Sequence, residues 1–113
     1  MTCTGDSADG SYPATNLVTK ISGKLLAIET NPGATAPTDN YDIVLNDLDG
    51  HDVLEGVAAN RDTSTTEKAN IVFSGTSVNP PVAKNDTLQL VITNNSVNDA
   101  IVVVKLYYEG DAD

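Results

Sequence analysis

Residues 29–54 read ETNPGATAPTDNYDIVLNDLDGHDVL, and this stretch decides the fold. Within it, Tyr41, Ile43 and Leu45 occupy every second position. A period of two is typical of a β-strand with one buried face, because successive side chains point to opposite sides. The pattern therefore predicts a strand with these three side chains facing inward.

Two turns flank this strand in the sequence. Residues 31–34 read NPGA, which favours a type II turn, with proline in the second position and Gly33 at positive φ in the third. Residues 47–50 read DLDG, and an Asp-Gly pair is a strong hairpin signal. We therefore expect a hairpin here, with a returning strand that begins at 51–54.

Short apolar runs separated by turn signals continue along the chain, and segments with a convincing helical period are absent. About seven or eight short strands at this spacing predict an all-β fold, a single antiparallel β-sandwich or barrel-like domain with flexible termini. Besides the central strand, the expected strands are 17–21, 24–30, 70–74, 88–93 and 101–108. The expected core residues are Leu26, Ile28, Tyr41, Ile43, Leu45, Leu88, Leu90 and Ile92.

The two ends of the chain are polar. Residues 1–11 contain mostly Gly, Ser, Thr and Asp, which predicts a flexible N-terminal arm. Residues 12–109 form the predicted β-domain, and residues 110–113 an acidic tail.

The chain is strongly acidic. Its 113 residues carry 16 acidic and 6 basic side chains, a net charge of −10. Nucleic acid and anionic membranes are therefore not expected as partners, because both require clustered Lys and Arg. The first residues lack the pattern of a secretory signal, and no apolar run reaches the length of a membrane span, so we expect synthesis in the cytoplasm.

Asp47, Asp49 and Asp52 raise the question of a metal site, because calcium prefers carboxylate oxygens. Aligning Gly50 with the glycine of an EF-hand loop places Leu45 and Gly56 at ligand positions, so that register fails. The simpler interpretation is a solvated turn whose aspartates cap the backbone. We therefore expect no metal and no cofactor, with the three aspartates as the weak candidates.

The sequence does not indicate an enzyme. Its single histidine, His51, lies in the acidic turn, without the neighbouring nucleophile that a Ser–His–Asp arrangement requires. One histidine and one cysteine do not supply a structural zinc site, and no glycine-rich phosphate loop precedes a helix. We therefore expect no catalytic residues.

The last expected strand, 101–108, reads IVVVKLYY and is apolar on both faces. A sandwich buries one face of a strand, so the other face needs a cover. We consider three alternatives for the cover of this second face: a long loop, the N-terminal arm, or another protein chain. The interface candidates are Ile101, Val102, Val103, Val104, Leu106, Tyr107 and Tyr108.

From Ile21 to Thr63 the chain resembles small structural proteins of tailed bacteriophages and prophages. The resembling segments are 23–26, 31–43, 47–50, 52–54 and 59–63. The resemblance covers a little over a third of the chain and implies a virion component without catalytic residues.

From this resemblance we expect a capsid decoration or cement protein on the outer head surface, assembled in the host cytoplasm. The expected partners are the major capsid protein or other virion proteins. A closed homo-oligomer such as a trimer would suit a symmetric position. A tail or head–tail joining component is the alternative within this class. A calcium-dependent adhesion or carbohydrate-binding module is the alternative from another class, and an acidic surface adapted to high salt would leave the fold unchanged.

Overall fold

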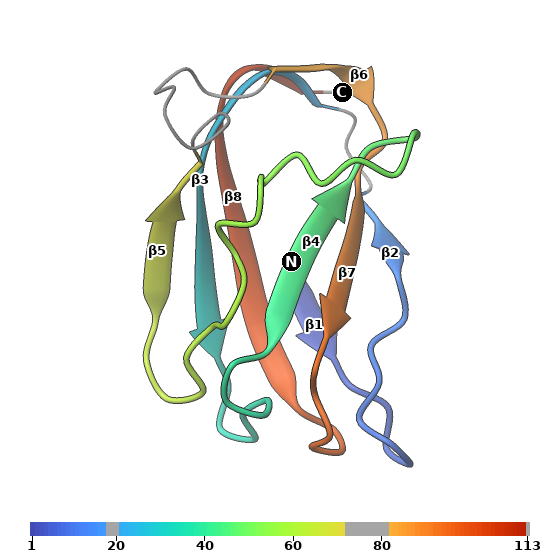
Figure 1. Ribbon diagram of the computed structural model, residues 1–113, viewed down its shortest axis with the longest axis vertical. Helices are drawn as coiled ribbons and strands as arrows, with labels where there is room; N and C mark the ends of the chain where they lie inside the picture. Colours follow the sequence, from blue (N-terminus) through green and yellow to red (C-terminus); the bar gives the residue numbers. More distant parts are fainter. Residues whose placement is uncertain (18–20, 72–81, 113) are drawn as a thin grey trace.

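The computed structural model describes residues 1–17, 21–71 and 82–112. Its strands form two antiparallel sheets that pack face to face (Figure 1), and no helix occurs within these ranges. This confirms the predicted all-β sandwich. The strands are β1 (Thr2–Thr4), β2 (Thr15–Asn16), β3 (Ile21–Pro32), β4 (Asp42–Asn46), β5 (Glu67–Asn70), β6 (Val82–Asp86), β7 (Gln89–Thr93) and β8 (Ile101–Ala112).

The larger sheet, sheet A, has the strand order β1-β8-β3-β5. Strand β6 also pairs with β3, along residues 21–24, whereas β5 pairs along residues 27–30. The smaller sheet, sheet B, has the order β2-β7-β4. The short strands β1 and β2 therefore end their sheets at the same margin of the sandwich (Figure 1).

The core lies between the two sheets and contains most of the predicted residues. The prediction is confirmed for seven of the eight expected core residues, all of them buried: Ile28, Tyr41, Ile43, Leu45, Leu88, Leu90 and Ile92. Leu26 was wrongly predicted to be buried, since its side chain is 39% exposed, whereas its neighbour Leu25 is fully buried.

A bulge in β3 explains the exposure of Leu26. Leu25 pairs with Tyr108 and Ala27 pairs with Tyr107, so Leu26 is an extra residue with no partner of its own on β8. An extra residue in one strand reverses which positions face inward on either side of it. Leu25 and Ile28 consequently both face the core, although strict alternation would separate them.

The irregularity expected at Gly23 occurs in the pairing with β6, whose register shifts between Ile21 and Gly23, while β3 continues without a break along β8. Gly23 lies opposite Gly110 of β8, and a Cβ atom on it would lie only 2.2 Å from the carbonyl oxygen of Glu109. Its φ of 142° is also one that side chains rarely adopt. The expected strand 24–30 is therefore part of the longer strand β3, whereas most of the other expected strand, 17–21, lies outside the described residues, which omit 18–20.

The expected type II turn at 31–34 is wrong, because Gly33 does not have a positive φ. The chain instead stays beside β8, where the Gly33 N–H donates to the carbonyl of Ile101 at 2.7 Å. A Cβ atom on Gly33 would lie 3.0 Å from the Ile101 side chain. The glycine therefore serves close packing against β8.

The expected hairpin turn at 47–50 is confirmed. Gly50 has a φ of 82°, and its N–H donates to the carbonyl of Asp47. The returning strand is wrong, since only an isolated bridge between Asn46 and Asp52 forms before the chain enters successive turns. The chain does not continue as a strand here, because the N–H groups of Leu54 and Gly56 donate to the Asp52 carboxylate and not to a neighbouring strand.

Both polar ends are strands. Residues 2–4 of the expected flexible arm form β1 on the edge of β8, and the Val104 N–H donates to the carbonyl of Met1. The expected tail continues β8, with Ala112 opposite Ile21. Backbone pairing does not depend on apolar side chains, which is why composition alone pointed to flexibility.

The strand expected at 70–74 begins earlier than predicted. β5 spans Glu67–Asn70, and the Ile71 N–H donates to the carbonyl of Leu26. The remainder of that expected strand falls in 72–81, outside the described residues.

The bulge makes a direct prediction about stability. Leu25→Ala should reduce the free energy of unfolding by about 2–5 kcal/mol, because it leaves a cavity in the core. Leu26→Ala is the matched control and should cost less than about 1 kcal/mol, because its side chain already meets solvent. Urea unfolding followed by circular dichroism measures both. Equal losses, or a larger loss at Leu26, would contradict the bulge.

Candidate functional site

The aspartates of the 47–50 turn organise their own backbone. The Asp47 carboxylate accepts hydrogen bonds from the N–H groups of Asp49 and His51, at 2.9 and 3.0 Å. The side chain of Asp49 is exposed and lies on the outside of the turn. This arrangement is that of a capped turn, since short acidic side chains readily bond to nearby backbone donors.

Asp52 plays the same part for the turns that follow. One carboxylate oxygen accepts from the N–H groups of Leu45 and Leu54, and the other accepts from Gly56, all at 3.0 Å. Both oxygens are therefore directed to the backbone. Within the described ranges, no cluster of three or more His, Cys, Asp or Glu side chains could hold a metal ion.

The two faces of β8 have different environments. Val102 and Val104 are buried, and Leu106 and Tyr108 pack against the core from partly buried positions. The alternate residues Ile101, Val103, Lys105 and Tyr107 point out of the sandwich. The interface candidates therefore divide between the two faces, and Ile101, Val103 and Tyr107 are the ones that point outward.

Residues that pair with these positions share the same side of sheet A, which we call the outer face. Strand registers place the following residues on it: Thr2, Thr4, Lys24, Ala27, Glu29, Asn31, Lys68, Asn70, Ile101, Val103, Lys105, Tyr107 and Glu109.

Charged and aromatic side chains meet on the outer face. The Lys68 ammonium lies 4.2 Å from the centre of the Tyr107 ring, within cation–π range. The Lys105 ammonium lies 3.8 Å from a carboxylate oxygen of Glu29. Of the three covers considered for β8, neither an arm nor a loop hides this face entirely, since the Tyr107 side chain remains 37% exposed.

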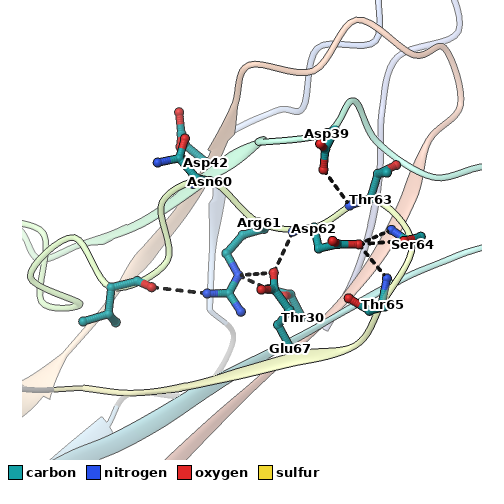
Figure 2. Close-up of polar contacts among 11 residues, drawn as sticks. Thr30, Asp39, Asp42, Asn60, Arg61, Asp62, Thr63, Ser64, Thr65 and Glu67 are labelled. Carbon is teal, nitrogen blue, oxygen red and sulfur yellow. Dashed lines mark hydrogen bonds and ion pairs between the residues drawn. The ribbon is translucent and has the colours of Figure 1, made fainter.

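A buried arginine links the two sheets at the margin formed by β4 and β5. Arg61 is only 5% exposed, and Figure 2 shows its guanidinium directed toward Thr30 and Glu67. Its Nε donates to the Thr30 hydroxyl at 3.1 Å and lies 3.4 Å from the Glu67 carboxylate. Its Nη1 donates to the carbonyl of Val57 at 3.2 Å.

The backbone of Arg61 completes this link. Its N–H donates to the carbonyl of Tyr41 at 2.8 Å, and its carbonyl accepts from Asn40 at 3.0 Å. Thr30 belongs to sheet A, and Tyr41 directly precedes β4 of sheet B. One residue thus ties both sheets to the loop that joins them.

Tyr41 lies in the same region and is fully buried. Its hydroxyl has no hydrogen-bond partner among the described residues. Burial raises the pKa of Tyr41, and the nearby Thr30 side chain, followed by the positive charge of Arg61, offsets part of that rise. Arg61 and its partners therefore hold the two sheets together at this margin.

Sequence reasoning missed this cluster. Residues 57–69 read as a polar connection rich in local hydrogen bonds, and a single arginine there suggests a solvated side chain. The signal in the sequence was the excess of acidic residues. With 16 acidic and 6 basic side chains, an arginine has many carboxylates with which to form an ion pair.

Asp62 caps the next turn, as Figure 2 shows. Its carboxylate accepts from the N–H and hydroxyl of Ser64 and from the N–H of Thr65. These hydrogen bonds, that of the Ser64 N–H foremost, lower the pKa of Asp62 to about 2. They favour the ionised form because a carboxylate accepts more strongly than a neutral acid.

Comparisons with protein-family models, with curated proteins and with solved structures each returned no match. The described residues contain no helix long and apolar enough to cross a membrane.

The low pKa of Asp62 predicts a pH dependence. The folded-state pKa lies below the ordinary value of 3.8, so the cap contributes fully above that value and is lost as the pH falls through about 2. Asp62→Asn should therefore have a lower free energy of unfolding than the wild type at neutral pH. Between pH 3.8 and about pH 2, the free energy of unfolding of this variant should fall less than that of the wild type. Urea unfolding at several pH values measures the difference.

Asp49→Asn is the matched control, because it removes an exposed aspartate from another turn without removing a hydrogen bond from its side chain. This control should keep the wild-type pH profile. A profile of Asp62→Asn that runs parallel to the wild type down to about pH 2 would refute the role of the cap.

Proposed function

We propose that this protein is a structural component of a tailed-bacteriophage virion that decorates the outer surface of the head and attaches through the outer face of sheet A. The observation that carries the proposed attachment site is the distribution of charge over the fold. The virion role itself is supported by the resemblance of residues 21–63 to small phage structural proteins.

The outer face differs in charge from the rest of the molecule. Among the residues whose side chains the structure describes, it holds Lys24, Lys68 and Lys105 against Glu29 and Glu109, so basic and acidic charges nearly balance there. The whole chain, by contrast, has a net charge of −10. An acidic partner surface would therefore meet less repulsion at this face than over the acidic remainder of the molecule.

Side chains on the outer face also suit a protein partner. Tyr107 is 37% exposed with the Lys68 ammonium over its ring, and Val103 and Ile101 lie further along the same face of β8. Tyrosine is enriched at protein interfaces, where its ring adds apolar area and its hydroxyl can find a hydrogen bond. The acidic remainder suits the outside of a head better than its DNA-filled interior, because phosphates repel it. A closed homo-oligomer, such as a trimer at a symmetric position, belongs to the same proposal.

Location on the particle tests the virion role. Antibody raised against the domain should label the heads of purified particles from the source strain in immunogold electron microscopy. Label confined to tails or necks would support the head–tail alternative, and particles that lack the protein altogether would refute the virion role.

The attachment face can be tested by one substitution. Tyr107→Asp should leave the fold intact and weaken binding to heads at least about tenfold, because it removes the aromatic contact area and adds a negative charge to the face that would meet an acidic partner. Co-sedimentation with heads, and analytical ultracentrifugation for self-association, are the measurements. Leu48→Asp is the matched control, since Leu48 is 79% exposed in the turn after β4. Equal binding by the two variants would show that attachment uses another surface.

A further inference from the structure

The two margins of the sandwich are built differently. At one margin, the free edge of β4 is covered, since the Ile43 N–H donates to the carbonyl of Ala58 and Tyr41 forms a bridge with Arg61. At the other margin, β1 and β2 end their sheets, and no described strand pairs with their free edges (Figure 1). We call the space between β1 and β2 the seam.

Unpaired backbone groups face the seam from β1. Met1 and Val104 exchange two backbone hydrogen bonds, and the Gly5 N–H donates to the carbonyl of Ala100. In an antiparallel pair, residues that bond to the partner alternate with residues whose N–H and C=O point away. The backbone groups of Thr2 and Thr4 therefore point away from β8, toward the seam.

Unpaired backbone groups also face the seam from β2. The Leu17 N–H donates to the carbonyl of Leu88, and Asn16 lies one residue before it, opposite Gln89. By the same alternation the backbone groups of Asn16 point away from β7. A strand placed in the seam would therefore find donors and acceptors along both walls.

Two adjoining cavities open the seam toward the core. One has a volume of about 140 Å³ and is lined by apolar residues that include Leu17, Ile28, Leu45 and Leu106. The other has a volume of about 260 Å³ and is lined by residues that include Cys3, Tyr12 and Ile92. Both cavities share Met1 and Leu90, so neighbouring apolar side chains of one segment could fill them.

The seam also lacks the usual protection of an exposed strand edge. Proteins commonly place charged side chains on edge strands to prevent pairing with other chains. β5 has Glu67 and Lys68, whereas β1 and β2 contain no charged side chain. An uncharged edge beside two open cavities, the smaller of them apolar, is therefore suited to accept a further strand.

Charge at one end of the seam defines the chemistry of its occupant. Asp6 and Asp9 lie between β1 and β2 and are exposed, and the Asp99 N–H donates to the carbonyl of Asp6. Residues 1–17 contain no lysine or arginine. This end of the seam is therefore acidic, and a basic group of a partner would be attracted to it.

We propose that the seam binds an extended segment of another protein chain, with apolar side chains at alternate positions and lysine or arginine at the end beside Asp6, Asp9 and Asp99. The segment would add a strand to β1, so that its backbone supplies much of the affinity and the two cavities select its side chains. The seam is separate from the outer face, and binding there does not depend on the virion role.

Cys3 provides a site-specific measurement, because it is the only cysteine and lines one of the cavities. The probe is a synthetic peptide of alternating valine and threonine preceded by lysines. It should slow the reaction of Cys3 with a thiol reagent saturably, by about tenfold when the free peptide is at ten times its dissociation constant. Circular dichroism confirms that the protein stays folded.

Three controls decide the interpretation. A peptide of the same sequence with methylated backbone nitrogens should give no protection, because it cannot pair as a strand. A peptide with glutamates in place of the lysines should bind more weakly, as should the lysine peptide to the protein with Asp6→Asn and Asp9→Asn. Absence of protection by the lysine peptide, or equal protection by the methylated peptide, would overturn the proposal.

Discussion

Pairing between β3 and β8 is the constraint on which the rest of the structure depends. These two long strands occupy the centre of sheet A, and their register fixes which side chains of each enter the core. The bulge at Leu26 lets Leu25 and Ile28 face inward together, opposite Tyr108 and Leu106. Without it, the half of β3 beyond the bulge would present the wrong face to sheet B.

The same pairing needs two glycines. Gly23 and Gly110 lie opposite each other, and a Cβ atom on either would lie 2.2 Å from a backbone oxygen of the other strand. Close backbone approach at this point keeps β8 in register through Ala112, where the sequence suggested only a tail. A local feature of two residues thus converts a polar terminus into a strand.

The amount that could be predicted from the sequence follows from these contacts. Tyr41, Ile43 and Leu45 alternate without interruption, so the period of two identified their strand and their burial. Leu25 and Leu26 are chemically identical, so no pattern could show which one the bulge turns outward. The strand β1 was missed because it is held by backbone hydrogen bonds to β8, which leave no trace in composition.

The candidate sites also differ in whether local sequence or the whole fold determines them. The turn of Asp47 and Gly50 is determined locally, and its capped geometry was predictable from those residues alone. The link through Arg61 joins residues far apart in the sequence, so its partner Thr30 could not be identified without the fold. The division of 101–108 into a core face and an outer face required the register of β8 as well.

These differences give the molecule two distinct margins and one distinct face. Arg61 and the loop before it close the margin at β4, while the seam between β1 and β2 stays open. The outer face gathers three of the six basic side chains of an acidic protein. Contacts with other chains are therefore proposed at the outer face, where charge is nearly balanced, and along the uncharged edges of β1 and β2, whose acidic end would attract a basic group.

Nuclear Overhauser contacts across β3 and β8 test the central claim most directly. The bulged register predicts backbone contacts that pair Ala27 with Tyr107 and Ile28 with Leu106. A strand without the bulge would instead pair Leu26 with Tyr107 and Ala27 with Leu106, and observing that second set would contradict the assignment of the core and outer faces.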